Sequence, residues 1–110
     1  ILWSYTLPMR DRAPFLSSLL SFDWDSGIDT KNQLAHGVRC VEAEQVFSVG
    51  AFRVQEDETH SQAEPRFVAF GRTEQGRLLT VCFTIRDRKI RVISARDMSR
   101  KERRFYDEGS

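Results

Sequence analysis

Histidine and arginine are the residues in this sequence whose types and spacing could support a reaction. His60 stands in a polar stretch with Glu64 and is followed by Arg66. Imidazole is the side chain whose ordinary pKa suits proton transfer near neutral pH. Of the 17 basic residues all but three are arginine, which suits bidentate contact with phosphate. These residue types indicate proton transfer beside an anionic ligand, and the plainer alternative for each is a solvated surface side chain.

The charge of the chain is divided between its two halves. Residues 1–65 hold five Lys and Arg against ten Asp and Glu, a net charge of −5. Residues 66–110 hold twelve against six, a net charge of +6. An excess of arginine in one half favours an anionic partner for that half, although a solvated charged surface would give the same count.

Length and cysteine content bound the class of protein. A chain of 110 residues is large enough for one domain with a modest core. Cys40 and Cys82 lie far apart without CxxC spacing, which favours free thiols in a reducing compartment over a disulfide or a metal site. No apolar run approaches the ~20 residues that span a bilayer. We therefore predict a cytoplasmic protein with no membrane segment, metal or cofactor.

Periodicity predicts the order of secondary structure. Residues 1–21 show no sustained period, and we expect an N-terminal extension outside a single domain of residues 22–110. Alternating residues predict strands at 22–25, 51–55, 66–73, 78–86 and 90–96. Helical spacing predicts helices at 31–36, 41–47 and 100–107. The expected fold is a small α+β domain, with an antiparallel sheet of four or five strands, two N-terminal helices and one C-terminal helix.

Three local patterns support these boundaries. Ser99 and Glu102 have the spacing of a capping box, which predicts the start of the last helix. Gly37 and Gly50 are placed to end the first two helices in a left-handed conformation. The polar residues 56–65 form the longest expected loop, and long loops are often functional.

The last hairpin predicts where positive charge gathers on the sheet. If Asp87 and Arg88 form a two-residue turn, one face pairs apolar residues and belongs to the core. The other face pairs Arg86 with Lys89, Thr84 with Arg91, and Cys82 with Ile93. Like charges side by side are unfavourable unless an anion or solvent separates them, so this face could bind phosphate.

Many separate stretches of the sequence resemble one family when they are taken together. This family is that of the BrnT toxins, and the resemblance covers about residues 22–109. The stretches that carry it are Phe22-Asp23-Trp24-Asp25, Asn32, His36-Gly37-Val38, Glu42-Ala43, Val46-Phe47, His60-Ser61, Glu64, Arg66, Gly71, Gly76-Arg77-Leu78-Leu79, Thr84-Ile85-Arg86, Arg91-Val92-Ile93-Ser94-Ala95-Arg96, Glu102-Arg103 and Tyr106.

The resemblance implies an endoribonuclease toxin of a type II toxin–antitoxin pair with a RelE-like fold. The implied partners are an RNA substrate and a BrnA-like antitoxin, so that DNA is contacted only through the antitoxin. Metal-independent cleavage by attack of the 2′-hydroxyl requires a base, an acid, and cations that stabilise the phosphate in the transition state. The implied function belongs to a bacterial stress response.

We assign candidate residues by combining these requirements with the family pattern. The catalytic candidates are His60, Glu64, Arg96, Arg103 and Tyr106. The candidates for RNA and phosphate binding are Arg66, Arg86, Lys89, Arg91, Arg100 and Lys101. His36 and Trp24 are further candidates, with a helix end and the core as their plainer roles. For Tyr106 the plainer alternative is packing against the sheet beside Phe105.

Two departures from the family pattern keep a second hypothesis open. The Lys that commonly precedes the His-Gly pair is Ala35 here, and another usual Lys is Ile28. These replacements favour a catalytically silent relative that only binds an antitoxin. A plain nucleic-acid-binding domain is the third alternative, and we find no helix-turn-helix, RNP or zinc spacing for it.

Overall fold

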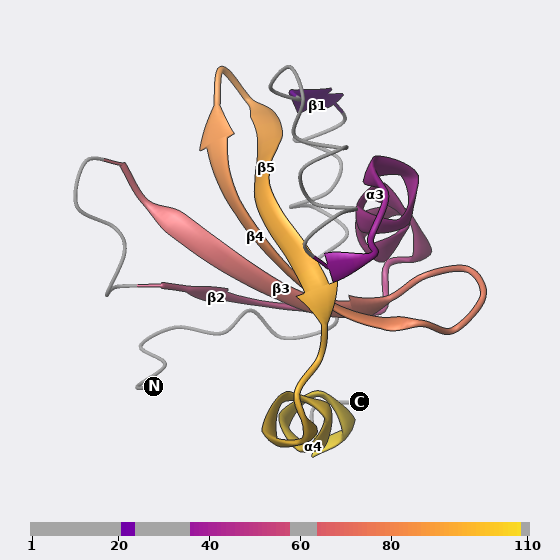
Figure 1. Cartoon of the computed structure of the whole chain (residues 1–110). Coiled ribbons are helices and arrows are strands. Elements are labelled where there is room, and N and C mark those ends of the chain that lie inside the picture. The colour runs from indigo at the N-terminus through magenta and orange to yellow at the C-terminus, as the bar shows by residue number, and fades with distance from the viewer. Residues whose placement is uncertain (1–20, 24–35, 58–63, 109–110) are drawn as a thin grey trace.

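The fold is an α+β arrangement built on one five-stranded sheet (Figure 1). The structure, a computed structural model, describes residues 21–23, 36–57 and 64–108. The strands are β1 (Ser21–Asp23), β2 (Arg53–Glu56), β3 (Arg66–Arg72), β4 (Leu78–Arg86) and β5 (Lys89–Asp97). Their order across the sheet is β1-β5-β4-β3-β2. The helices of the described part are α3 (Cys40–Val49) and α4 (Arg100–Glu108).

The sheet is mixed, which corrects the predicted antiparallel, RelE-like sheet. Strands β2 to β5 form the antiparallel meander that the sequence predicts. Strand β1 instead pairs parallel to β5, with Phe22 opposite Ile90. No hairpin joins these two strands, so no turn forces them to run in opposite directions. The described residues hold two helices against the three predicted; the helix expected at 31–36 lies outside them, except for His36.

Helix α3 covers one face of the sheet and forms the larger core with it. Its buried face carries Ala43, Val46 and Phe47. The Phe47 ring lies 5.2 Å from Phe83 and 5.3 Å from Phe52, measured between ring centroids. Gly71 of β3 allows this close approach, because a Cβ there would lie 2.7 Å from Val46 Cγ1. Gly50, with φ at 84°, ends the helix as predicted.

Helix α4 packs on the opposite face and forms a smaller second core. The buried residues of this core are Val68, Phe70, Met98 and Tyr106. The predicted capping box is confirmed: the Ser99 N–H donates to Glu102 Oε1 at 2.9 Å, and the Glu102 N–H donates to Ser99 Oγ at 3.2 Å. In Figure 1, α4 lies beneath the sheet while α3 lies beside β5.

The β4–β5 hairpin has the predicted turn and an unpredicted irregularity. Asp87 and Arg88 have φ of 50° and 63°, as expected for the central residues of a type I′ turn. The pairs from Arg86–Lys89 to Phe83–Val92 are those predicted. Beyond them the register shifts, and Cys82 lies opposite Ser94 rather than Ile93. The predicted pairing of Cys82 with Ile93 was therefore wrong, because β5 carries one extra residue, a β-bulge, at this point.

Candidate nucleic-acid interface

Five basic residues project from the sheet face that α4 only partly covers, and we call them the basic face. The register places them together: Arg66 is opposite Thr84, which is opposite Arg91, and Arg86 is opposite Lys89. Side chains two residues apart on a strand share a face. The members of the basic face are Arg66, Arg86, Lys89, Arg91 and Arg96.

The bulge at Ile93 brings Arg96 onto the basic face. Arg91 and Arg96 are five residues apart, and an uninterrupted strand would point them to opposite sides of the sheet. With one extra residue in β5, Ala95 turns into the core beside α3, where it is 1% exposed. Arg96 then lies opposite Thr80, on the same side as Arg91. Bulges often re-aim side chains in this way next to functional sites.

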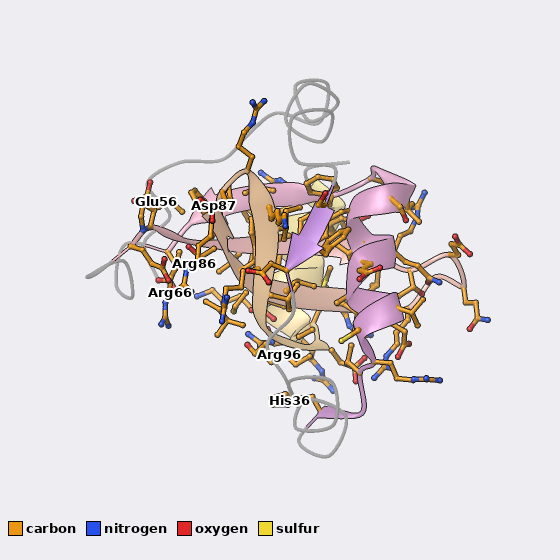
Figure 2. The ribbon with its side chains drawn as sticks, turned by 90° about the horizontal axis from the view of Figure 1, so that it is seen from above. His36, Glu56, Arg66, Arg86, Asp87 and Arg96 are labelled. Atoms are coloured by element: carbon orange, nitrogen blue, oxygen red, sulfur yellow. The ribbon has the colours of Figure 1, made fainter. Side chains whose placement is uncertain are left out.

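Arg86 lies at the end of β4, next to the β4–β5 turn, and Glu64 holds its guanidinium. The Glu64 carboxylate accepts two hydrogen bonds from the guanidinium, with N–O distances of 2.8 and 3.0 Å. This contact lowers the pKa of Glu64 and raises the pKa of Arg86. Arg66 and Arg86 lie close to each other at the left of the view in Figure 2, well separated from Arg96. The pair is exposed, so a competing anion can reach Arg86 from solvent.

Two more carboxylates partly neutralise the positive charge of the basic face. Asp23 of β1 accepts a hydrogen bond from Arg91 at 3.1 Å. Glu102 of α4 makes a bidentate pair with Arg96, with N–O distances of 2.7 and 2.8 Å. The Arg96 guanidinium has five N–H donors, and its bonds to Glu102 and to the Asp97 carbonyl use three of them.

Glu102 is the most strongly bound carboxylate near this surface. It accepts hydrogen bonds from Arg96, from the Ser99 backbone and from the Thr80 hydroxyl. Burial alone would raise the pKa of Glu102, but these hydrogen bonds outweigh it and lower the pKa to about 2. The sequence identified Glu102 as a helix cap, but not as the residue that orients Arg96.

A hollow opens in the sheet beside the basic face, with a volume of about 220 Å³. Cys82 and Ser94, directly opposite each other on β4 and β5, form part of its wall. Burial raises the pKa of the Cys82 thiol, although a hydrogen bond with Ser94 partly offsets this effect. We did not predict this hollow from the sequence, because its walls depend on the bulge. The complete lining is Asp57, Arg66, Phe67, Cys82, Ile93 and Ser94.

The remaining predicted residues are placed as follows. Arg100, Lys101 and Arg103 are exposed on α4. Tyr106 is 4% exposed and its hydroxyl donates to the Ala51 carbonyl, which is the packing role weighed for it. Its catalytic role stays a prediction. His60 and Trp24 lie outside the described residues.

His36 is exposed and precedes Gly37, whose carbonyl accepts a hydrogen bond from Arg77 at 2.9 Å. Arg77 also pairs with Glu42 of α3 at 3.0 Å and with Asp97 of β5 at 2.8 Å. This arginine therefore ties the segment that carries His36 to the end of the strand that carries Arg96. In Figure 2, His36 and Arg96 both lie in the lower part of the view.

Residues 21–23, 36–57 and 64–108 form neither a metal site nor a membrane-spanning helix. That part of the chain contains no group of three or more His, Cys, Asp or Glu side chains that could hold a metal ion. None of its helices has the length and apolar character needed to cross a membrane.

The fold and the basic face define a small α+β protein with a surface suited to an anionic polymer. The family model described as "Ribonuclease toxin, BrnT, of type II toxin-antitoxin system" matches residues 24–102. The chain belongs to the BrnT family. Membership identifies it as a ribonuclease toxin at the level of the family, and implies an antitoxin as its partner.

A solved structure supports the same fold. The crystal structure of the Brucella abortus ribonuclease toxin BrnT, determined at 1.1 Å, is similar with a TM-score of 0.52. The two sequences are 22% identical, and the alignment covers 73% of this chain and 97% of that chain. At this identity the likeness shows the fold alone. Comparison with curated proteins gives no significant match.

Proposed function

We propose that this protein is an endoribonuclease toxin that cleaves RNA without a metal ion, by attack of a ribose 2′-hydroxyl on the adjacent phosphate. The catalytic domain comprises residues 22–110, and a BrnA-like antitoxin neutralises it in the cytoplasm. The observation that carries this proposal is the gathering of five basic side chains on one accessible sheet face of a BrnT-family domain.

The ion pairs on the basic face are weak enough to yield to phosphate. Exposed pairs such as Arg86–Glu64 contribute little to stability, because solvent screens their attraction and both side chains lose freedom when they pair. A phosphate can accept charge-assisted hydrogen bonds from two arginines at once, whereas each of these carboxylates pairs with one arginine of the basic face. Glu64 and Asp23 thus keep Arg86 and Arg91 oriented, and RNA takes their place. Arg96, held by the more buried Glu102, offers its remaining N–H donors in a fixed position.

His60 is the proposed general base. It is three residues from Asp57 and four from Glu64 in the sequence. Asp57 lines the hollow and Glu64 contacts Arg86. We propose that the His60 imidazole accepts the 2′-hydroxyl proton, while the arginines stabilise charge that develops on the phosphate. We leave Tyr106 out of the reaction, because the Ala51 carbonyl occupies its hydroxyl.

The experiment is incubation of the full chain with a labelled single-stranded RNA in EDTA, beside the His60→Ala variant. Attack by the 2′-hydroxyl leaves a 2′,3′-cyclic phosphate and a free 5′-hydroxyl, so both product ends are analysed. We expect these ends from the wild type and a loss of at least about a hundredfold in rate for His60→Ala.

Two results would refute the proposal. Products with other end groups would exclude attack by the 2′-hydroxyl. A folded wild type that never cleaves would favour the silent relative that Ala35 and Ile28 suggest, and that protein would still bind its antitoxin.

A further inference from the structure

We propose that the hollow beside the basic face binds one nucleobase of the RNA, and that it prefers bases with an exocyclic amino group. This inference rests on the proposed function and extends it to the choice of sequence. It concerns the six residues that line the hollow, of which only Arg66 is among the candidate site residues predicted from the sequence.

The position of the hollow fits a base whose phosphate lies on the basic face. Cys82 and Ser94 of its wall are two residues along β4 and three along β5 from the Thr84–Arg91 pair. Two residues along a strand correspond to about 7 Å. Arg66 belongs to both surfaces. A single nucleotide can therefore place its phosphate against Arg91 and Arg66 while its base enters the hollow.

The size and lining of the hollow match a base better than a larger ligand. Its volume of about 220 Å³ is below the roughly 300–1,000 Å³ of pockets for drug-sized molecules. Cys82 and Ile93 supply an apolar surface, and burial keeps the Cys82 thiol in its neutral form by raising its pKa. A nucleobase has apolar faces and a polar edge, and unstacked bases of single-stranded RNA are recognised through both.

Asp57 decides which part of the nucleotide enters and which bases are preferred. Asp57 lines the hollow, and beyond the effect of burial its carboxylate is close enough to the Cys82 thiol to raise the pKa of that thiol. A carboxylate repels a phosphate, and it accepts hydrogen bonds but donates none. An exocyclic amino group is the donor that such a carboxylate selects, as Asp and Glu do with the amino group of cytosine. Cytosine, adenine and guanine carry this group, whereas uracil presents only carbonyl oxygens and a ring N–H. The Ser94 hydroxyl can donate or accept at a second position.

The test measures binding of short 2′-O-methyl oligonucleotides to the full chain by fluorescence anisotropy. The methyl group removes the attacking hydroxyl, so that binding is measured without cleavage. The probes are an all-uridine oligonucleotide and the same oligonucleotide with a single cytidine or adenosine. The variants are Asp57→Ala and Ser94→Ala, with Asp107→Ala on α4 and Ser48→Ala on α3 as matched controls outside the hollow. Thermal unfolding of each variant checks the fold.

We expect the wild type and both controls to bind the amino-bearing probes about tenfold more tightly than the uridine probe. Asp57→Ala should bind all probes within about threefold of one another, and Ser94→Ala should show reduced discrimination. Equal binding of every probe by the wild type would overturn the inference and leave the nuclease proposal standing. So would an Asp57→Ala variant that discriminates as the wild type does.

Cleavage of the unmodified RNAs by the same protein samples separates the two proposals. Discriminating binding without any cleavage would refute the nuclease and support the hollow as a base site. Failure to bind any of the probes would overturn both proposals, because the basic face would then hold no nucleic acid.

Discussion

Arg96 at the end of the last strand and Glu102 in the first turn of α4 form a bidentate ion pair, with N–O distances of 2.7 and 2.8 Å. The pair joins the sheet to the helix that follows it. The same carboxylate accepts hydrogen bonds from the Ser99 N–H and the Thr80 hydroxyl. One side chain thus starts α4, fixes that helix to β4, and orients an arginine of the basic face.

Because the pKa of Glu102 is lowered to about 2, the free energy of unfolding depends on pH in the acid range. The pKa of a glutamate in the unfolded chain is about 4.3, so Glu102 stays ionised to a lower pH in the folded state than in the unfolded state. The contribution is therefore complete above about pH 5 and is lost as the pH falls toward about 2, with an upper bound of about 3 kcal/mol. Urea denaturation between pH 2 and pH 7 should show this loss for the wild type and a smaller loss for Glu102→Gln, in which Glu64 and Asp97 still have lowered pKa values. The exposed control Glu74→Gln should lose stability with falling pH as the wild type does. A Glu102→Gln variant whose free energy of unfolding falls with pH as steeply as that of the wild type would contradict the account.

Arg77 stabilises the junction between α3 and the sheet. Its guanidinium pairs with Glu42 and Asp97 and donates to the Gly37 carbonyl. We expect Arg77→Gln to lower the free energy of unfolding by about 1–3 kcal/mol at pH 7, because one substitution removes several charge-assisted hydrogen bonds that are only partly screened. Urea denaturation beside the exposed Arg72→Gln provides the measurement. Equal stability of these two variants would show that the network is dispensable.

The bulge at Ile93 can be tested by removing a residue. Deletion of Ile93 would move Ala95 out of the core and turn Arg96 toward it, and an unpaired buried charge costs about 3–5 kcal/mol. We expect the deletion variant to lose cooperative thermal unfolding by circular dichroism. Ile93→Ala keeps the register and should cost only about 1 kcal/mol, since this side chain is half-buried. A deletion variant as stable as Ile93→Ala would mean that the bulge does not set the register.

Substitution of Tyr106 tests whether its hydroxyl has a structural or a catalytic role. Its hydroxyl donates to the Ala51 carbonyl inside the second core. Tyr106→Phe should therefore destabilise the protein by about 1 kcal/mol and leave the rate of RNA cleavage unchanged. A large loss of cleavage with unchanged stability would restore the catalytic role that the family pattern suggests for this residue.

Local patterns were sufficient to predict most of the elements of this fold. The capping box at Ser99, the two-residue turn at Asp87 and Arg88, and the glycine after α3 each act within a few residues, so the sequence shows them directly. The sequence did not show the parallel pairing of β1 with β5. That pairing joins segments nearly seventy residues apart in the chain, as in Phe22 with Ile90, and no local pattern encodes it.

The candidate site shows the same division. The pairing of Arg86 with Lys89 and of Thr84 with Arg91 followed from alternation alone. The position of Arg96 and the presence of the hollow did not follow from alternation, because both depend on one extra residue in β5. The break in alternation between Val92 and Ala95, which are both buried, was the available signal. The acidic partners of the basic face come from β1, α4 and the segment before β3, and only tertiary structure brings them together.

The initial rate of RNA cleavage in EDTA tests the central claim most directly, that the basic face holds the scissile phosphate. We would compare the wild type with the Arg86→Ala, Arg91→Ala double variant. A second double variant, Arg39→Ala with Arg104→Ala, removes the same charge from exposed positions outside the basic face. The account predicts a loss of at least about a hundredfold for the first double variant and nearly full activity for the second. Equal rates for both folded variants would contradict it.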